Sequence, residues 1–206
     1  GVAAPSANRF GKVSPTTAAH VQDEFGESLL ILDGGECDVG IESTIVDCTR
    51  AEPIILRPGA LGAQEMEHAI GQPIHDPFAV TATVSQEASN ALDSDQPAAP
   101  GTLKAHYAPN AKVRLMDAKS IQSGLEMLGE HATGIAIYTR TRIHTAASGV
   151  TEVPMPSDPT KVAHELFATL RHLDAQGIGL IWIETPPSDA SWNGVRDRLT
   201  RAAASA

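Results

Sequence analysis

The sequence predicts an α/β protein that ends in a small, doubly wound, Rossmann-like domain over residues 111–206. Two observations predict this fold class. Short apolar runs alternate with helical segments in this part of the chain, which is typical of a parallel sheet flanked by helices. The 206 residues are 42% hydrophobic, which is enough to bury a substantial core.

The expected strands of this domain are the runs "KVRLM", "GIAIY", "TEVPM" and "IGLIWIE". Helices are expected over residues 119–128, 159–173 and 191–204. Asp158 suits the N-cap of the middle helix and Pro159 its first position. Apolar residues at helical spacing predict its buried face, namely Val162, Leu166, Leu170 and Leu173.

Residues 1–71 contain a different set of elements. A helix is expected from Ser14 and Pro15 to about Phe25, because serine suits the N-cap and proline the first turn. The run "SLLILDGG" predicts a buried strand that passes into a tight turn, and "GIESTIVDCT" and "PIILRPGA" predict two strands joined by a turn. A short helix near residues 64–70 ends at Gly71, which can adopt a left-handed cap.

Residues 72–110 are expected to be a linker. They are rich in Pro, Ala, Ser and Asp and show no sustained period until the closing stretch "APGTLKAHYAP". The formal net charge is −10 and the isoelectric point is about 5.2, so no broad basic face is available to neutralise a nucleic-acid backbone. Direct tRNA or other nucleic-acid binding by this chain alone is therefore disfavoured.

Cys37 and Cys48 lie in no metal-binding or disulfide pattern, and we expect both to be buried as small apolar residues. No apolar run is long enough to span a membrane and no signal peptide begins the chain, so no membrane association and a cytoplasmic location are expected. His164 and His172 are eight residues apart, which is not zinc-site spacing. We interpret them as surface residues of a helix.

Several reaction classes lack their sequence signatures. The chain has no G-x-S-x-G elbow, Walker loop, G-x-G-x-x-G or H-E-x-x-H motif. What remains is a set of hydroxyl and amide residues at turns, together with an arginine that follows a strand. A helix N-terminus with a free hydroxyl and a nearby arginine can hold phosphate. The alternative is structural: the serines cap turns, Thr44 is an ordinary strand residue and Arg57 is a surface charge.

Several stretches point to one family. "APSANRFGKVSPT", "LDGGECDVGIESTIVD" and "ILRPGA" resemble the latter half of the YrdC-like domain of threonylcarbamoyl-AMP synthases. "APGTLKAHYAP" and "WNGVRDRL" resemble the linker and C-terminal domain of the longer, two-domain form. The likeness implies that residues 1–71 are the C-terminal half of a twisted α/β YrdC-like catalytic domain. Residues 72–110 then form the linker and residues 111–206 the C-terminal domain.

The resemblance implies a nucleotidyltransferase, an L-threonylcarbamoyladenylate synthase. Such enzymes combine L-threonine, bicarbonate and ATP into threonylcarbamoyl-AMP and pyrophosphate, and a downstream tRNA-modifying transferase complex uses the product. ATP is a substrate, and Mg²⁺ is the expected metal ion, with no protein ligand assigned to it. The reaction needs positioning and stabilisation of phosphate charge rather than a covalent intermediate, so the absence of a catalytic triad is expected.

The resemblance also implies roles for particular positions. ATP contacts are expected at Ser6, Asn8, Ser14 and Arg57. Threonine contacts are expected at the backbone of Ala4 and at Ser43. The linker is expected to fold across the pocket as a lid that carries His106 and Tyr107.

The chain departs from the family pattern at its start, where the first half of the YrdC-like domain and its basic motif would precede it. We expect residues 1–71 to be poorly stable alone and residues 111–206 to fold independently. Three alternatives stay open: an RNA-binding or regulatory YrdC-like module, a hydrogenase-maturation carbamoyltransferase with a YrdC-like domain, and a catalytically inactive remnant. The C-terminal α/β domain and the "HYAP" stretch do not suit the carbamoyltransferase.

Overall fold

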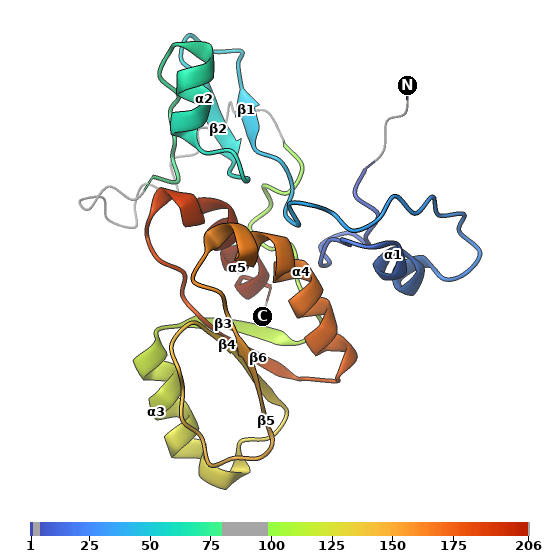
Figure 1. Cartoon of the computed structure of the whole chain (residues 1–206), viewed down its shortest axis with the longest axis vertical. Coiled ribbons are helices and arrows are strands. Elements are labelled where there is room, and N and C mark those ends of the chain that lie inside the picture. The colour runs from blue at the N-terminus through green and yellow to red at the C-terminus, as the bar shows by residue number, and fades with distance from the viewer. Residues whose placement is uncertain (2–4, 80–98, 206) are drawn as a thin grey trace.

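The computed structural model describes Gly1, residues 5–79 and residues 99–205. Its C-terminal part contains a sheet of four parallel strands in the order β3-β6-β4-β5. The strands are β3 (Lys112–Met116), β4 (Ile135–Thr139), β5 (Val150–Pro154) and β6 (Leu180–Glu184). The main helices around them are α3 (Ala118–Leu128), α4 (Pro159–Ala175) and α5 (Asn193–Ala203), with short 3₁₀ turns η2 (Gly129–His131) and η3 (Ala190–Trp192) (Figure 1).

Helices cover both faces of this sheet, because alternate strand residues point to opposite sides. Ile137 and Trp182 pack with Ile121 and Leu125 of α3 in one apolar cluster. The other face packs against α4 and α5 in a larger cluster that includes Tyr138, Ile181, Ile183, Leu166, Leu170 and Leu199. The doubly wound parallel-sheet fold predicted for this region is therefore confirmed.

The long helix α4 begins as its sequence predicts. The Asp158 carboxylate accepts a hydrogen bond from the backbone N–H of Thr160 at 2.9 Å, and Pro159 occupies the first turn. The four apolar residues predicted for its inner face are all buried, namely Val162, Leu166, Leu170 and Leu173. This helix thus presents one apolar face to the sheet.

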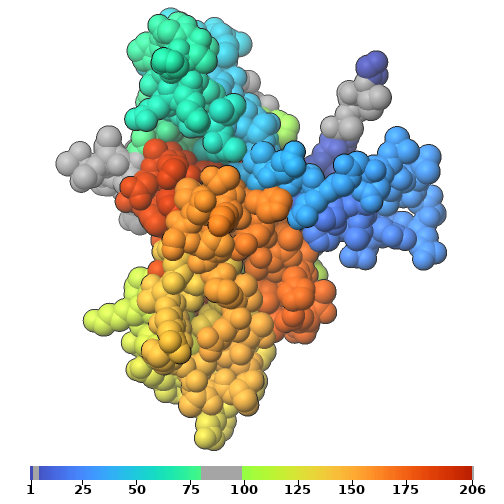
Figure 2. Space-filling model, in the orientation of Figure 1, coloured from blue at the N-terminus to red at the C-terminus, as the bar shows by residue number. Residues whose placement is uncertain are grey.

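The N-terminal part consists of α1 (Ala18–Phe25), β1 (Ile45–Asp47), β2 (Ile54–Arg57) and α2 (Ala63–Ile70). β1 and β2 form an antiparallel pair, as the two β-branched runs predict. Gly71 ends α2 in the left-handed conformation with φ of 72°, which is also as predicted. In the space-filling view, the α2 region and the α1 region project as separate lobes from the C-terminal domain (Figure 2).

The predicted start of α1 is wrong. The helix begins at Ala18 and Thr17 is its N-cap, with the Thr17 hydroxyl accepting from the N–H of His20 at 3.2 Å. Ser14 lies before the helix, and its hydroxyl donates to the Glu42 carboxylate. A tertiary hydrogen bond therefore replaces the local capping bond that the sequence suggests.

The predicted strand at residues 28–35 is also absent from the structure. This segment is irregular, and the side chains of Leu30 and Leu32 are 87% and 90% exposed. No strand of the described residues lies beside it to pair with its backbone. An apolar run becomes a buried strand only when a neighbouring strand and a covering layer are present, and the sequence pattern alone does not supply either.

The expectation that both cysteines are buried is wrong as well. Cys37 and Cys48 are free and exposed. Cys37 lies in the loop before Gly40, and Cys48 lies in the turn that follows β1. Loops and turns run over the surface, so the general tendency of cysteine to be buried does not apply at these positions.

The N-terminal loops pack into the core of the C-terminal domain. Val13, Ile41 and Tyr107 belong to the same buried cluster as the inner faces of α4 and α5. Residues 99–107, which we call the strap, lead toward β3, and Tyr107 is the last residue of the strap. The two parts of the chain therefore share one core, which fixes how the site loops lie.

Candidate functional site

A surface hollow of about 460 Å³ brings together the two serines predicted to contact ATP. Ser6 and Ser14 line it, and residues 37–42 form its other side. The lining includes two carboxylates, Asp38 and Glu42. Ser6 is exposed, whereas Ser14 is only 5% exposed. A second hollow of about 580 Å³, beside α2, contains none of the predicted site residues.

Ser14 is held by a chain of charged contacts. Its hydroxyl donates to Glu42 Oε1 at 2.5 Å, and Glu42 Oε2 accepts from Arg198 Nε of α5 at 2.9 Å. The Arg198 side chain is fully buried. The sequence interpretation missed both Glu42 and Arg198, although each lies within a stretch that carries the family resemblance, "GIES" and "WNGVRDRL". A buried arginine that pairs across domains has no local sequence signature.

Asn8 supports the loop that leads to Ser14. Its amide donates to the carbonyl of Arg9 at 3.0 Å and to that of Lys12 at 3.2 Å. The Asn8 Oδ1 atom is buried and has no hydrogen-bond partner among the described residues. Of the two roles expected for Asn8, the structure shows the loop contacts, and an ATP contact stays a prediction.

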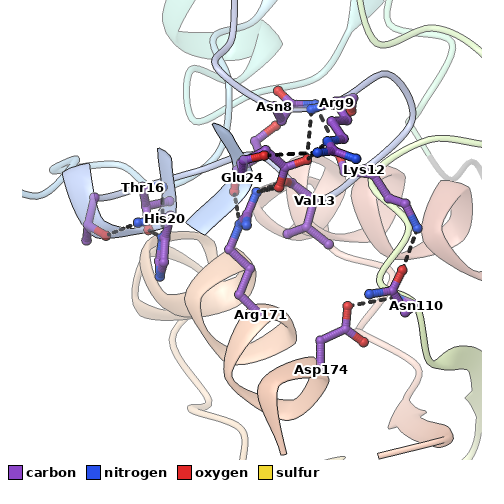
Figure 3. A network of polar contacts seen from close by, with 12 residues as sticks. Asn8, Arg9, Lys12, Val13, Thr16, His20, Glu24, Asn110, Arg171 and Asp174 are labelled. Carbon is purple, nitrogen blue, oxygen red and sulfur yellow. Dashed lines mark hydrogen bonds and ion pairs between the residues drawn. The ribbon is translucent and has the colours of Figure 1, made fainter. Parts of the chain in front are cut away.

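The same loop is anchored to α4, as Figure 3 shows. Arg171 of α4 donates to the backbone carbonyls of Val13 and Ser14 and pairs with Glu24 of α1 at 3.2 Å. Burial raises the pKa of the Glu24 carboxyl, but hydrogen bonds from the Arg9 backbone and from Arg171 outweigh it, so the pKa is lowered overall. Glu24 therefore stays ionised beside its arginine partner, which keeps α1 attached to α4.

Arg57 is buried at 6% exposure, which excludes the interpretation of this residue as a surface charge. Its guanidinium donates from Nε and Nη2 to the Ser43 carbonyl, at 3.1 and 2.9 Å, and from Nη1 to the Pro100 carbonyl at 2.9 Å. The Ser43 side chain itself is exposed. In this structure Arg57 thus ties the Ser43 backbone to the strap, and its contact with phosphate stays a prediction.

His106 and Tyr107 lie in the strap, and neither lines the hollow of Ser6 and Ser14. Tyr107 is 1% exposed and stacks on Phe167 of α4 with ring centroids 5.4 Å apart. Burial raises the pKa of the Tyr107 phenol and lowers the pKa of the His106 imidazole. The Tyr107 hydroxyl has no partner among the described residues. The structure thus places Tyr107 in the core, and the lid role expected for this pair stays a prediction.

Ala4, expected to contact threonine, lies outside the described residues. In the described ranges, no group of three or more His, Cys, Asp or Glu side chains could hold a metal ion. No helix of this same part of the chain is both long and apolar enough to cross a membrane.

The fold and the site define an α/β protein with a C-terminal Rossmann-like domain and an N-terminal part that carries a serine-lined hollow. The family model described as "Threonylcarbamoyl-AMP synthase, C-terminal domain" matches residues 63–204. A second model, described as "Telomere recombination", matches residues 1–59. This chain belongs to the threonylcarbamoyl-AMP synthase family.

Curated relatives support this membership. The chain is 33% identical to the threonylcarbamoyl-AMP synthase of Pyrococcus abyssi over 98% of its own length and 57% of the relative. It is 32% identical to the Schizosaccharomyces pombe protein of that name, over 98% of the chain and 52% of the relative. The Bacillus subtilis protein of that name is 30% identical over 98% of this chain and 57% of the relative. The chain spans about half the length of the curated relatives it matches.

Solved structures agree with the sequence relatives. The fold matches a crystal structure of Pyrococcus abyssi Sua5 complexed with L-threonine with a TM-score of 0.72 and 30% identity. That match covers 98% of this chain and 57% of the other. A variant of the same protein, in which a histidine and a tyrosine are replaced by alanine, matches with a TM-score of 0.75, 30% identity and coverage of 98% and 56%. The mixed α/β fold predicted from the sequence is confirmed by these matches.

Proposed function

We propose that this chain supplies part of the substrate site of an L-threonylcarbamoyladenylate synthase, a nucleotidyltransferase. The observation that carries the proposal is the meeting of Ser6 and Ser14 in one hollow with the loop that leads to Ser43. The named relatives and the Sua5 structure complexed with L-threonine support the substrate class. The acidic charge of the chain gives no support to direct tRNA binding.

The proposed reaction balances without a covalent enzyme intermediate. The threonine amine combines with bicarbonate to give a carbamate and water. A carbamate oxygen then attacks the α-phosphorus of ATP, a P–O bond forms, and pyrophosphate leaves with the electrons of the broken P–O bond. The protein must hold the two reactants close together and in line, since proximity alone lowers such a barrier by about 7–11 kcal/mol.

The described residues suit a positioning role. Ser14, whose hydroxyl donates to Glu42, lines the hollow in which the nucleotide would lie. Ser43 presents an exposed hydroxyl from a backbone that Arg57 clamps, and this hydroxyl would bind threonine. A clamp on the backbone limits the motion of the hydroxyl, so its contact with substrate costs less ordering entropy.

Mg²⁺ is proposed to enter with ATP. This ion commonly binds through one or two carboxylates together with substrate phosphates, rather than in an all-protein cage. Asp38 and Glu42 are the carboxylates of the hollow, and Glu42 is already paired with Arg198. Asp38 is therefore the residue we propose to reach the ion, which would neutralise charge on the phosphates.

The product would pass to a tRNA-modifying transferase complex, which is the partner expected for such an enzyme. We also propose that the protein works in the cytoplasm. The reaction is tested by measuring pyrophosphate release from ATP, with threonine and bicarbonate each omitted in turn. The assay is run on this chain and on the longest polypeptide that carries it. Release that requires both co-substrates supports the proposal, and release that ignores threonine contradicts it.

Serine variants test the individual roles. Ser14→Ala should raise KM for ATP, whereas Ser43→Ala should raise KM for threonine, because each removes one hydroxyl contact. Ser123→Ala is the matched control, since Ser123 is exposed on α3 at the far side of the C-terminal sheet. Unchanged KM values in both site variants would refute the assignments. Salt-sensitive tRNA binding would instead favour the RNA-binding alternative.

A further inference from the structure

Helix α5 of the C-terminal domain packs directly against the loops that carry the predicted site residues. Gly194 lets the helix approach closely: a Cβ atom there would lie 2.8 Å from Ile41 Cδ1 and 2.9 Å from the Gly59 carbonyl oxygen. Ile41 packs with Val195 and Leu199 of α5 in the shared core. The loops before β1 and after β2 are thus pressed onto one face of a single helix.

Arg198 is the polar centre of this contact, and its side chain has no exposed surface. Besides the bond to Glu42 Oε2, Nη2 donates to the Glu42 carbonyl at 3.0 Å and Nη1 to the Pro58 carbonyl at 2.6 Å. Nη1 also lies 3.0 Å from Asp197 Oδ2. One guanidinium therefore fixes the backbone and the side chain of Glu42 together with the loop that follows β2.

This arginine does more than join two domains, because Glu42 carries its effect into the hollow. One oxygen of the Glu42 carboxylate accepts a hydrogen bond from the Ser14 hydroxyl, and the other accepts one from Arg198 Nε. The residue after Glu42 is Ser43, whose carbonyl is held by Arg57. Both serines assigned to substrates are thus within one residue or one hydrogen bond of Glu42.

Net stability is a weak reason for such a contact. A buried ion pair often contributes no more to folding than apolar residues of the same volume would, since both charges lose their water. The planar guanidinium instead fixes the relative positions of the groups that it binds, because its donors are fixed relative to one another. A lysine at the same place could not reach three acceptors in fixed directions.

We propose that Arg198 is a positioning residue of the synthase site, acting through Glu42 on Ser14 and Ser43. The inference rests on the proposed function and assigns a task to the C-terminal domain. By this inference, the domain holds the serine-bearing loops in the arrangement that binds ATP and threonine.

The first test compares Arg198→Met with Arg198→Lys in the pyrophosphate assay. A displacement of about 1 Å at such a site can cost about 100-fold in rate, so Arg198→Met should lose about 100-fold in kcat/KM. Arg198→Lys keeps the positive charge but not the fixed directions of the guanidinium donors, so its kcat/KM should lie between those of the wild type and Arg198→Met. Arg140→Met is the matched control, because Arg140 forms a largely buried pair with Glu184 at 2.9 Å elsewhere in the C-terminal domain.

The second test separates positioning from general stability by combining variants. On a Ser14→Ala background, Arg198→Met should cost less than about tenfold in kcat/KM for ATP, since the group it positions is already gone. Glu42→Gln gives a milder variant of nearly unchanged shape. Ser14 and Arg198 donate to different oxygens of Glu42, and the amide keeps an oxygen at only one of these two places, so this variant should also lower kcat/KM. Full additivity of the Ser14 and Arg198 effects would overturn the inference.

A third measurement does not depend on the reaction. In amide NMR spectra of this chain, Arg198→Met and Glu42→Gln should both shift the signals of Ser14 and Ser43, whereas Arg140→Met should leave them in place. If wild-type protein releases no threonine-dependent pyrophosphate but these shifts occur, the proposed function fails and the positioning network stands. If Arg198→Met leaves both serine signals unmoved, the positioning role is refuted whatever the activity.

Discussion

Gly40 offers a sharp test of how the site loop is seated on the C-terminal domain. Its φ is 85°, in the left-handed region, and a Cβ atom there would lie 2.3 Å from the His164 carbonyl oxygen and 2.4 Å from that of Ala163. Both oxygens belong to the backbone of α4, which cannot rotate away as a side chain would. Gly40→Ala must therefore push the loop off the helix.

Two costs add in this variant. The left-handed conformation costs a residue with a Cβ about 1–2 kcal/mol, and forcing extra volume into a packed contact costs about 1–3 kcal/mol. We expect a loss of about 2–5 kcal/mol in the free energy of unfolding or, if the loop detaches locally, in loop docking. The contact must open from 2.3 Å to at least 3.0 Å, which moves the loop that carries Glu42.

Gly35→Ala is the matched control. Gly35 lies in the same loop with φ of 94°, and a Cβ atom there meets nothing within 4 Å. It carries the backbone strain without the collision, so we expect it to cost only about 1–2 kcal/mol. The difference between the two variants isolates the contact with α4.

Urea unfolding gives the difference in the free energy of unfolding, provided that the m value is the same in both variants. The pyrophosphate assay gives the difference in kcat/KM. Gly40→Ala should lower kcat/KM by about 100-fold, as expected for a displaced site loop. Gly35→Ala should change it little. Equal losses in the two variants would show that backbone strain, and not the seat on α4, governs the loop, and the reasoning would be wrong.

Three further predictions concern the surrounding contacts. Burial lowers the pKa values of His20 and His106, so protonation favours the unfolded chain. The free energy of unfolding should therefore fall as the pH drops below the ordinary histidine pKa of 6.5. Thermal melts at about pH 5.5–7.5 measure this dependence, and His106→Gln should make it weaker. Arg171→Met removes the bonds to the loop carbonyls and to Glu24, and should cost about 2–3 kcal/mol in urea unfolding, with an unchanged midpoint contradicting the anchor. Tyr107→Phe should keep or raise stability by up to about 1 kcal/mol, because the hydroxyl has no partner among the described residues, whereas Tyr107→Ala should cost about 3–5 kcal/mol; a strongly destabilised Tyr107→Phe would reveal a missed partner.

Much of the C-terminal domain follows from local sequence. Asp158 and Pro159 start α4 because their side-chain oxygen and fixed φ act within one turn. The apolar spacing of Val162 and Leu166 sets the buried face, and short apolar runs between helices give the parallel strands. These signals are short-range, so a single sequence displays them.

The site was predictable only in part. Resemblance indicated Ser6 and Ser14, and the structure brings both to one hollow. Sequence reasoning overlooked Glu42 and Arg198, because their pairing joins positions 156 residues apart and leaves no periodic pattern. The sequence also did not show that the Tyr107 ring is buried in the core, and the lid role expected for this residue stays a prediction.

By itself, the sequence determined the fold class, the helix and strand order of the C-terminal domain and the family likeness, because propensity, capping and hydrophobic period act over a few residues. Only the tertiary structure decided that α1 begins at Ala18, capped by Thr17 and not by Ser14, that residues 28–35 remain irregular, and that both cysteines are exposed. It also decided which arginines hold the site loops, Arg57, Arg171 and Arg198. Each of these outcomes depends on whether a distant segment of the chain offers a backbone, a carboxylate or a covering surface, and that is a property of packing rather than of local sequence.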